Sequence, residues 1–460
     1  MQSTSPSRLP ATSPESPSSP PSEPSKLVVS PTSLLAAFAT VPDPRRRQGT
    51  RFALPAILAL AVAAILSNHL SVLAIAEWGA NQCHDLLENL GFADGVTPHQ
   101  STLQRLFRKL DPDALSRALT SYFAKAKATP DSTKPETEPR PRGSQGVAID
   151  GKAQCGRLAF DSSGCPVHAL SAYLHDCGVV LAQEPIDPHP QPQTPAPTPT
   201  QAPPSPSPSP SPSPSETGPS EADDQVPLDK AEAELTVAPT LIKRIDWQGR
   251  VLTGDALFCQ RPICQDVVER GGDYLFIVKG NQPTLHEDIR LLFDPPPSLA
   301  SSLTDRREAK SVDQGHGRHD DTRELIASTD LAIYSDWPYL AQVFRHERTW
   351  QEKGQTKCQV RYGITSLPPE IADAERLLEL KRGHWQIENS DHRVKDVTMG
   401  EDASLVHLGN GPSAMATLRD LALSLLHRAG FRAIASRLRY HSTHPGEAVA
   451  MLIDCSFQNA

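Results

Sequence analysis

The stretch QGVAIDGK, from Gln145 to Lys152, is a short apolar run that ends in an aspartate, Asp150. Further along the chain GRVLTGDAL, from Gly249 to Leu257, has the same form and ends at Asp255. Apolar runs of this length favour buried β-strands. An aspartate after one strand is a routine turn residue, but two at corresponding positions point to a site at the edge of a sheet, where α/β proteins bind ligands.

The segments around these two runs predict the order strand, strand, strand, helix, strand, helix, strand. HALSAYLH and VVLAQEPI indicate two strands joined by a tight turn at DCG, and AEAELTVAPTLIKRI indicates a helix that contains a proline. PICQDVVERGG is then expected to be a helix and DYLFIVKGNQ a strand. This order predicts a mixed sheet flanked by helices, with the first and fourth strands side by side.

The later part of the chain is expected to begin with strands and end with helices. Residues 291–367 are strand-rich, and AERLLELKRGHWQIENSDHRVKD is expected to be helical. The last helices, PSAMATLRDLALSLLHRAG and FRAIASRLRYH, have an amphipathic pattern.

Residues 34–127 have a helical pattern and predict a small all-α N-terminal domain. The apolar run 52–76 is interrupted at Ser67, which favours a buried helical hairpin over a membrane span. Ser101 and Gln104 form the pattern of a capping box. Arg105, Arg108 and Lys109 then fall on the exposed side of that helix, either as an ordinary solvated face or as contacts to nucleic-acid phosphates.

Two segments rich in proline and serine are expected to be disordered, because they have little apolar surface to bury. The predicted division of the chain is a tail at 1–33, helices at 34–127, a linker at 128–145, a catalytic domain at 146–430 and a helical tail at 431–460. The catalytic domain would contain a Pro-rich insertion at 187–224 and a β-rich insertion at about 291–367.

Charge and cysteine content exclude some classes of protein. A formal net charge of −9 argues against a uniformly basic, histone-like surface, although local basic patches can still bind a polyanion. The eight cysteines lack the spacing of a zinc site or a disulfide framework, which suits a reducing cytoplasm. No signal peptide pattern is present at the N-terminus.

A third carboxylate, Glu388, lies in the basic stretch KRGHWQIENSDHRVKD. Two aspartates on neighbouring strands and one helical glutamate are ligands expected for a pair of Mg²⁺ ions, because these cations prefer carboxylate oxygen. Such a pair activates a water and stabilises the leaving oxygen in phosphoryl transfer.

Motifs along the chain resemble those of a known family. The matching stretches are DPRRRQGTRFALPAILALAVAAIL, STLQRLFRKLD, AIDGKA, TGDAL, GGDYLFIVKGNQP, GHGRHDDTR, RGHWQIEN and KDVTMGEDAS. In this order they resemble a DDE transposase of the IS-four superfamily, in the ISAs-type and H-repeat-associated branch. The resemblance implies an RNase H-like core with a β-rich region inserted before the glutamate.

Carried over to this sequence, the family's metal-binding carboxylates are Asp150, Asp255 and Glu388. Asp391, Glu401 and Asp402 are alternatives for the third ligand, and Asp391 would lie one helical turn from Glu388. Lys395 would return to the face of Glu388 and resembles the superfamily's trailing basic residue. His384 stands where the superfamily has arginine, and Phe258 and Cys259 stand where relatives commonly have a histidine.

Several further side chains are candidates for contact with DNA phosphates. They are Lys279, Arg318, Arg382, His384 and Lys395. His384 and His392 could instead be a pair that merely flanks the site, and Trp385 is expected to pack in the core.

The resemblance implies a transposase that binds terminal inverted repeats and target DNA, cuts strands with two Mg²⁺ ions (Mn²⁺ is expected to substitute) and transfers the freed 3′ end. It also implies a homodimer or larger synaptic complex, located in the cytoplasm and associated with the nucleoid when bound to DNA, and no membrane partner. The alternatives are an RNase H-like nuclease without strand transfer and a catalytically degenerate DNA-binding protein.

Overall fold

The structure is a computed structural model, and it describes residues 33–46, 50–126, 140–154, 167–175, 178–186, 228–298, 303–315, 318–352 and 354–453. The predicted disordered tail and Pro-rich insertion, and most of the predicted linker, lie outside these residues. No helix in the described ranges is long and apolar enough to cross a membrane.

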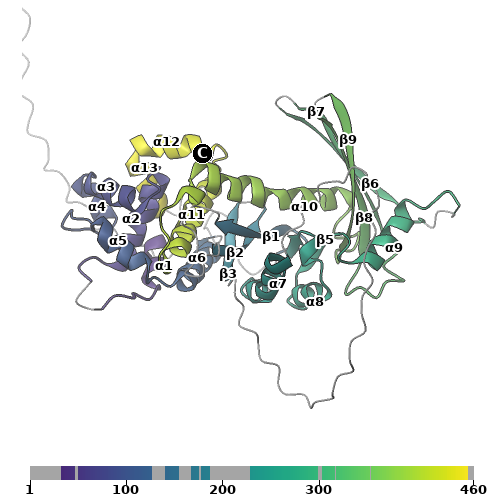
Figure 1. The fold of residues 1–460 in the computed structure, drawn as a ribbon, viewed down its shortest axis with the longest axis horizontal. Helices are drawn as coiled ribbons and strands as arrows, with labels where there is room; N and C mark the ends of the chain where they lie inside the picture. The colour runs from purple at the N-terminus through teal and green to yellow at the C-terminus, as the bar shows by residue number, and fades with distance from the viewer. Residues whose placement is uncertain are drawn as a thin grey trace, which may run out of the picture.

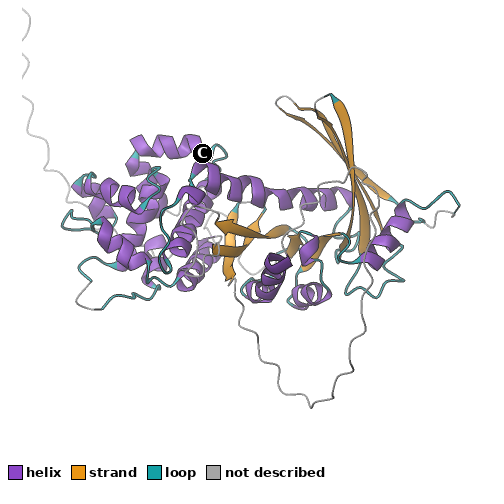
Figure 2. Ribbon diagram, in the orientation of Figure 1, coloured by secondary structure: helices purple, strands orange, loops and turns teal. Residues whose placement is uncertain are grey.

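A mixed sheet of nine strands occupies the middle of the described chain (Figures 1 and 2). Its spatial order is β3-β2-β1-β4-β5-β9-β8-β7-β6. The strands are β1 (Gln145–Gln154), β2 (Val167–Leu174), β3 (Val179–Ile186), β4 (Arg250–Gly254), β5 (Asp273–Val278), β6 (Arg307–Gly315), β7 (Arg318–Ser328), β8 (Gln342–Glu352) and β9 (Gln355–Thr365). The predicted mixed sheet with flanking helices is confirmed. The predicted order of its first five strands and the helices between them along the chain is also confirmed.

The first and fourth strands lie side by side, as predicted from their sequences. β1 and β4 pair in parallel, and the last pair in their register is Ala148 with Thr253. Asp150 and Asp255 each lie two residues beyond that pair. The expectation that β1 ends at Asp150 is wrong, because the strand continues to Gln154 through its antiparallel pairing with β2.

The β-rich insertion extends the same sheet instead of forming a separate one. β9 pairs antiparallel with β5, and β8, β7 and β6 follow outward from it. A helix, α9 (Pro283–Phe293), precedes these strands and overlaps only the start of the predicted strand-rich range of about 291–367. The β-strands themselves start at Arg307.

Helices cover both faces of the sheet (Figure 1). α10 (Ala374–Gln386) lies along one face, while α7 (Leu228–Lys243) and α8 (Arg261–Glu269) lie on the other. α10 buries Leu377, Leu378 and Leu380 against the sheet, in a core cluster that includes residues of β4, β5, β7 and β8. Apolar residues at this spacing form one stripe of a helix, which is why α10 can lie flat on the strands.

A glycine allows the end of α10 to approach the sheet closely. A Cβ atom added at Gly383 would lie 2.2 Å from the Nδ1 atom of His175, which follows β2. Any larger residue would therefore push the helix away from the strands.

The N-terminal region consists of helices, but it shares its core with the sheet. Its helices are α1 (Leu34–Ala39), α2 (Leu54–Leu66), α3 (Val72–Ala80), α4 (His84–Asn89), α5 (Gln100–Phe107) and α6 (Pro112–Ala126). α2 is buried at every residue except Pro55, so the predicted buried hairpin of α2 and α3 is confirmed. One hydrophobic cluster runs from these helices into β1–β5 and on to the C-terminal helices.

Two local helix predictions are wrong. The N-cap of α5 is His99, whose ring nitrogen Nδ1 accepts from the backbone N–H of Ser101, so Ser101 does not cap this helix. The predicted amphipathic helix near the C-terminus, α11 (Gly411–Arg428), is buried continuously from Ala414 to Leu426 because neighbours surround it.

α12 (Ile434–Thr443) and α13 (Pro445–Ile453) pack against α2 and complete the cluster.

Candidate active site

Asp255 is the more open of the two aspartates. It directly follows β4, and its side chain is 73% exposed. The Nε2 atom of His384 lies 3.5 Å from its carboxylate. The hydrogen bond from His384 holds the pKa of Asp255 below its ordinary value, and the charges of Lys279 and Arg361 act in the same direction. Asp255 is therefore ionised at neutral pH and available to a cation.

His384 is held in place from behind by a hydroxyl group. The Oγ1 atom of Thr253 lies 3.3 Å from Nδ1 of His384 and 3.0 Å from Nε2 of His175. Burial, with a contribution from the charges of His384 and Arg376, lowers the pKa of His175 to about 3, so this ring is neutral. His384 is thus part of a fixed chain of polar groups that ends at Asp255.

Asp150 is reached through a second histidine. The Nδ1 atom of His392 lies 3.3 Å from the Asp150 carboxylate, and its Nε2 atom lies 3.6 Å from Asp391. Contacts of this kind from a neighbouring side chain help to orient a carboxylate that binds a metal. His384, which is half-buried, thus contacts Asp255, and His392, which is buried, contacts Asp150.

Glu388 lies on a wider type of helix than expected. After α10 the chain forms π-helical segments at Ile387–His392 and Val394–Thr398. Glu388 is exposed there, whereas Asp391 is buried. π-Helical turns hold more residues than α-helical ones and occur often at functional sites.

The wider turn overturns the expected positions of two residues. Lys395 was predicted to share the face of Glu388, but it is only 1% exposed and lies on the inner side. Its ammonium group is 2.7 Å from Asp391 and 2.6 Å from Asp420. Burial alone would lower the pKa of Lys395, but these carboxylates outweigh it and raise the pKa. Lys395 is therefore an internal ion pair and is not accessible to DNA phosphates.

The alternatives for the third carboxylate differ from Glu388 in exposure. Asp391 is paired with Lys395, and Glu401 is buried between Arg419 at 3.4 Å and Lys152 at 3.9 Å. Glu388 keeps an exposed carboxylate on the segment that also carries His392. Asp402 is half-buried, so Glu388 is the most exposed of the four carboxylates.

The donors suit Mg²⁺, although the ligands are not drawn together. In the part of the chain that the structure describes, no three side chains of histidine, cysteine, aspartate or glutamate are grouped as a metal site. Asp150 and Asp255 still lie at corresponding positions of two paired strands, and Glu388 is exposed on the segment that follows α10. Hard oxygen donors with open positions are what this ion requires.

Three further residues were predicted to contact DNA phosphates, and their surroundings differ. Lys279 is exposed just after β5, and its charge acts on Asp255. Arg382 on α10 donates to Asp313 of β6 at 2.9 Å. Arg318 begins β7, and its side chain lies outside what the structure describes.

The predicted basic face of α5 is exposed, as expected. Arg105, Arg108 and Lys109 all point to solvent. Trp385 was expected in the core, but its side chain is 42% exposed at the surface of α10. Sequence reasoning missed His175 and Thr253, because nothing in a strand pattern tells which polar residue meets a helix across the sheet.

Two family models match the chain in succession. Residues 35–123 match the model described as DDE_Tnp_1-associated, and residues 225–425 match the transposase DDE domain. Asp255 and Glu388 lie inside the second match, and Asp150 lies between the two. Together the matches cover more than half of the chain.

Similar proteins carry related descriptions. "Putative transposase YncI" of Escherichia coli O157:H7 is 25% identical over 403 residues, which cover 86% of this chain and 87% of that protein. An "Uncharacterized protein in dhlA 3'region" of Xanthobacter autotrophicus is 27% identical over 333 residues, covering 72% of this chain and 92% of that protein. "H repeat-associated putative transposase YhhI" of Escherichia coli K12 is 23% identical over 403 residues, covering 85% and 90%.

The mixed sheet with helices on both faces is consistent with these matches. The chain belongs to the family of DDE transposases. Within that family its relatives include the H repeat-associated proteins, in agreement with the branch that its motifs resemble.

Proposed function

We propose that this chain catalyses metal-dependent cleavage of DNA strands at the ends of a mobile element and transfers the freed 3′ ends to target DNA. Asp150, Asp255 and Glu388 would hold two Mg²⁺ ions within an RNase H-like core. Bound there, the ions would activate the attacking hydroxyl and stabilise the leaving oxygen.

The observation that carries the proposal is the register of β1 and β4. Asp150 and Asp255 each lie two residues beyond the last pair of this register, at corresponding positions of neighbouring parallel strands, and this supports a shared metal site. The family match supports the proposal independently of the geometry, because Asp255 and Glu388 fall within the match to the transposase DDE domain.

The chain's own residues have distinct tasks in this proposal. Thr253 and His384 orient Asp255 and favour its ionised form, and His392 orients Asp150. Lys279, exposed at the end of β5, is placed to contact a phosphate beside Asp255.

The N-terminal helices are the proposed reader of the inverted repeats. Arg105, Arg108 and Lys109 form an exposed basic face on and after α5. Replacing Arg105 and Arg108 with glutamine should weaken duplex binding and reduce the slope of log affinity against log salt by about 0.9 for each phosphate that is no longer neutralised. A homodimer or larger assembly in the nucleoid would bring two ends together.

The direct test is cleavage of a duplex that carries the element's own terminal repeat, with Mg²⁺ or Mn²⁺ present. Asp150→Asn and Asp255→Asn should each lower the cleavage rate about 10³-fold or more, since several kcal/mol of transition-state stabilisation is lost. Metal-free DNA binding should persist. Unchanged cleavage in either variant would refute the proposal.

The products of this reaction distinguish a transposase from the two alternative functions. A nuclease of the same core would cut the strand without joining it to a target duplex. A degenerate DNA-binding protein would bind the repeat and cut under no divalent metal.

A further inference from the structure

A basic cavity lies beside the candidate active site, between the outer strands of the sheet and α10. Its volume is about 350 Å³. Six of its lining side chains are basic or imidazole groups: Arg323, His346, Arg348, Arg361, Lys381 and Arg382. They come from β7, β8, β9 and α10, which are far apart in the sequence.

The floor of the cavity is built from two neighbouring rungs of the sheet. In one rung Arg323 of β7 is opposite Arg348 of β8, which is opposite Gln359 of β9. In the next rung on the same face, His346 of β8 is opposite Arg361 of β9. Like charges directly opposite each other destabilise a sheet, so Arg323 and Arg348 need a negative group between them.

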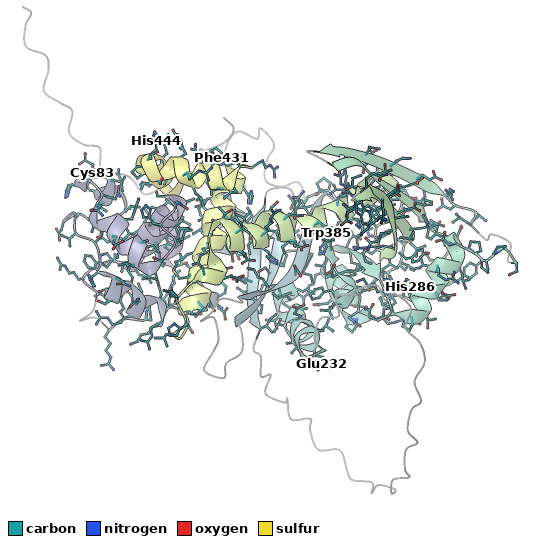
Figure 3. The ribbon with its side chains drawn as sticks, turned by 45° about the horizontal axis from the view of Figure 1, so that its top comes forward. Cys83, Glu232, His286, Trp385, Phe431 and His444 are labelled. Atoms are coloured by element: carbon teal, nitrogen blue, oxygen red, sulfur yellow. The ribbon has the colours of Figure 1, made fainter. Side chains whose placement is uncertain are left out.

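The other wall comes from the last turns of α10. Lys381 and Trp385 are four residues apart, so both project from one face of the helix. Figure 3 shows Trp385 where α10 passes the strands of the insertion, and its ring is 42% exposed. An exposed aromatic ring beside basic groups is a surface on which a nucleic-acid base can stack.

Carboxylates neutralise only part of this charge. Arg323 and Arg348 both pair with Asp321, at 2.8 and 2.7 Å, and Arg382 pairs with Asp313. Lys381 and Arg361 have no such partner among the residues that the structure describes, although Lys381 is only 8% exposed. A buried cation is costly unless it is paired.

His346 gives a second, independent sign of a missing ligand. Its side chain is 1% exposed, it lines the cavity, and neither ring nitrogen has a hydrogen-bond partner within the described part of the chain. Buried polar atoms are normally hydrogen-bonded, so each orphan calls for an explanation.

The ionisation of the cavity agrees with an uncompensated positive field. Burial, followed by the charges of Arg361, Arg323 and Arg348, lowers the pKa of Lys381 to about 7. Burial also lowers the pKa of Arg361. Asp255 opposes both shifts, so the cavity is close enough to the candidate active site to interact with it electrostatically.

We propose that this cavity binds a phosphodiester group of the DNA strand whose neighbouring phosphate lies at Asp255. Lys381 and Arg361 supply the unpaired positive charge for the phosphate, and Trp385 supplies a surface for the adjoining base. This inference rests on the proposed function and adds a second contact site for the same strand.

The test measures DNA binding in EDTA, where no cleavage takes place. The full chain is titrated into a fluorescein-labelled single-stranded DNA, and the affinity is followed by anisotropy at several salt concentrations. Lys381→Met and Arg361→Gln should each weaken binding about tenfold and reduce the salt slope by about 0.7, the value for one phosphate contact on a single strand. Lys381→Arg should restore most of the affinity because it retains the charge.

Arg270→Gln is the matched control, since it removes an arginine on α8, outside the cavity, that pairs with Asp266. Its affinity and salt slope should equal those of the wild type. A methylphosphonate strand, which lacks the phosphate charge, should bind the wild type and Lys381→Met equally.

Two results would overturn the inference. These are an unchanged affinity and salt slope in Lys381→Met, or an equal loss in Arg270→Gln. If one of these results is obtained and the wild-type protein cleaves repeat DNA with Mg²⁺, the proposed function stands while the cavity assignment fails. If cleavage is absent but the binding losses occur, the cavity stands as a DNA-binding site and the proposed catalysis fails.

Discussion

The two sides of the candidate active site differ in how far their buried charges are paired. On the side of Asp150, Lys395 is buried between Asp391 and Asp420, and Asp391 reaches Asp150 through His392. On the side of Asp255, basic groups from β7–β9 and α10 surround a cavity, and Lys381 has no carboxylate partner within the described residues.

This difference separates support from recognition. Charges that are balanced inside the protein hold segments of the chain together, and they are not available to a ligand. Charges that remain unbalanced destabilise the empty protein but are offered to an external anion. Removing a buried cation should therefore lower the free energy of unfolding on the side of Asp150 and raise it on the side of Asp255.

The largest effect is expected on the balanced side. Lys395→Met leaves two buried carboxylates without their cation, so it should cost about 3–5 kcal/mol of the free energy of unfolding. Urea denaturation followed by circular dichroism measures this. Lys357→Met, which breaks an exposed pair with Glu352, is the matched control and should cost less than about 1 kcal/mol. A small loss in Lys395→Met would show that the two sides do not differ.

The opposite sign is expected on the open side. Lys381→Met removes an unpaired buried cation and should raise the free energy of unfolding by roughly 2 kcal/mol in the absence of DNA, while DNA binding weakens. The same urea experiment at low salt, without DNA, measures the gain. A destabilised variant would mean that Lys381 has a structural role, like Lys395.

A pH experiment examines the cavity floor. Burial, with the charges of Lys381 and nearby arginines, lowers the pKa of His346 to about 3. The unfolded chain therefore takes up a proton near pH 6.5 that the folded chain does not, so stability is lost as the pH falls through 6.5. Between pH 7 and 5.5 the loss due to this group should be about 1 kcal/mol.

His346→Gln should remove that part of the pH dependence. His407→Gln, at an exposed position, should leave it unchanged. The comparison of unfolding free energies at pH 7 and 5.5 for the three proteins decides the matter, and equal slopes in all of them would contradict the assignment.

The smallest effect is expected at the boundary of the two sides. Arg382 forms a pair with Asp313 in which both side chains are about 40% exposed. Arg382→Gln should therefore change the unfolding free energy by less than about 1 kcal/mol, and the change should shrink further in high salt. A loss comparable to that of Lys395→Met would make this pair part of the balanced network.

The part of the fold that rests on strand patterns could be predicted from the sequence. The two runs that end at Asp150 and Asp255 indicated neighbouring strands, and β1 and β4 do pair in parallel. Apolar runs carry this information locally. How β9 joins β5, by contrast, depends on pairing between distant segments that no local pattern encodes.

The positions around Glu388 could not be predicted, because the helical pattern of this segment does not distinguish an α-helix from a π-helix. A period of 3.6 residues placed Lys395 on the face of Glu388, whereas the π-helical segments carry it into the core. The burial of an ion network also leaves no signal in a stretch where acidic and basic residues are mixed. The cavity was hidden for a similar reason, since four separate elements contribute to it.

The pairing of β9 with β5 has a consequence for where a strand would be cut. The floor of the cavity and the two aspartates stand on one continuous ladder of hydrogen bonds, from β1 through β4 and β5 to β9 and β8. Neither can shift along the strands without breaking that ladder. If the chain cleaves DNA as proposed, the distance between the phosphate held in the cavity and the phosphate that is cut would be a fixed number of nucleotides.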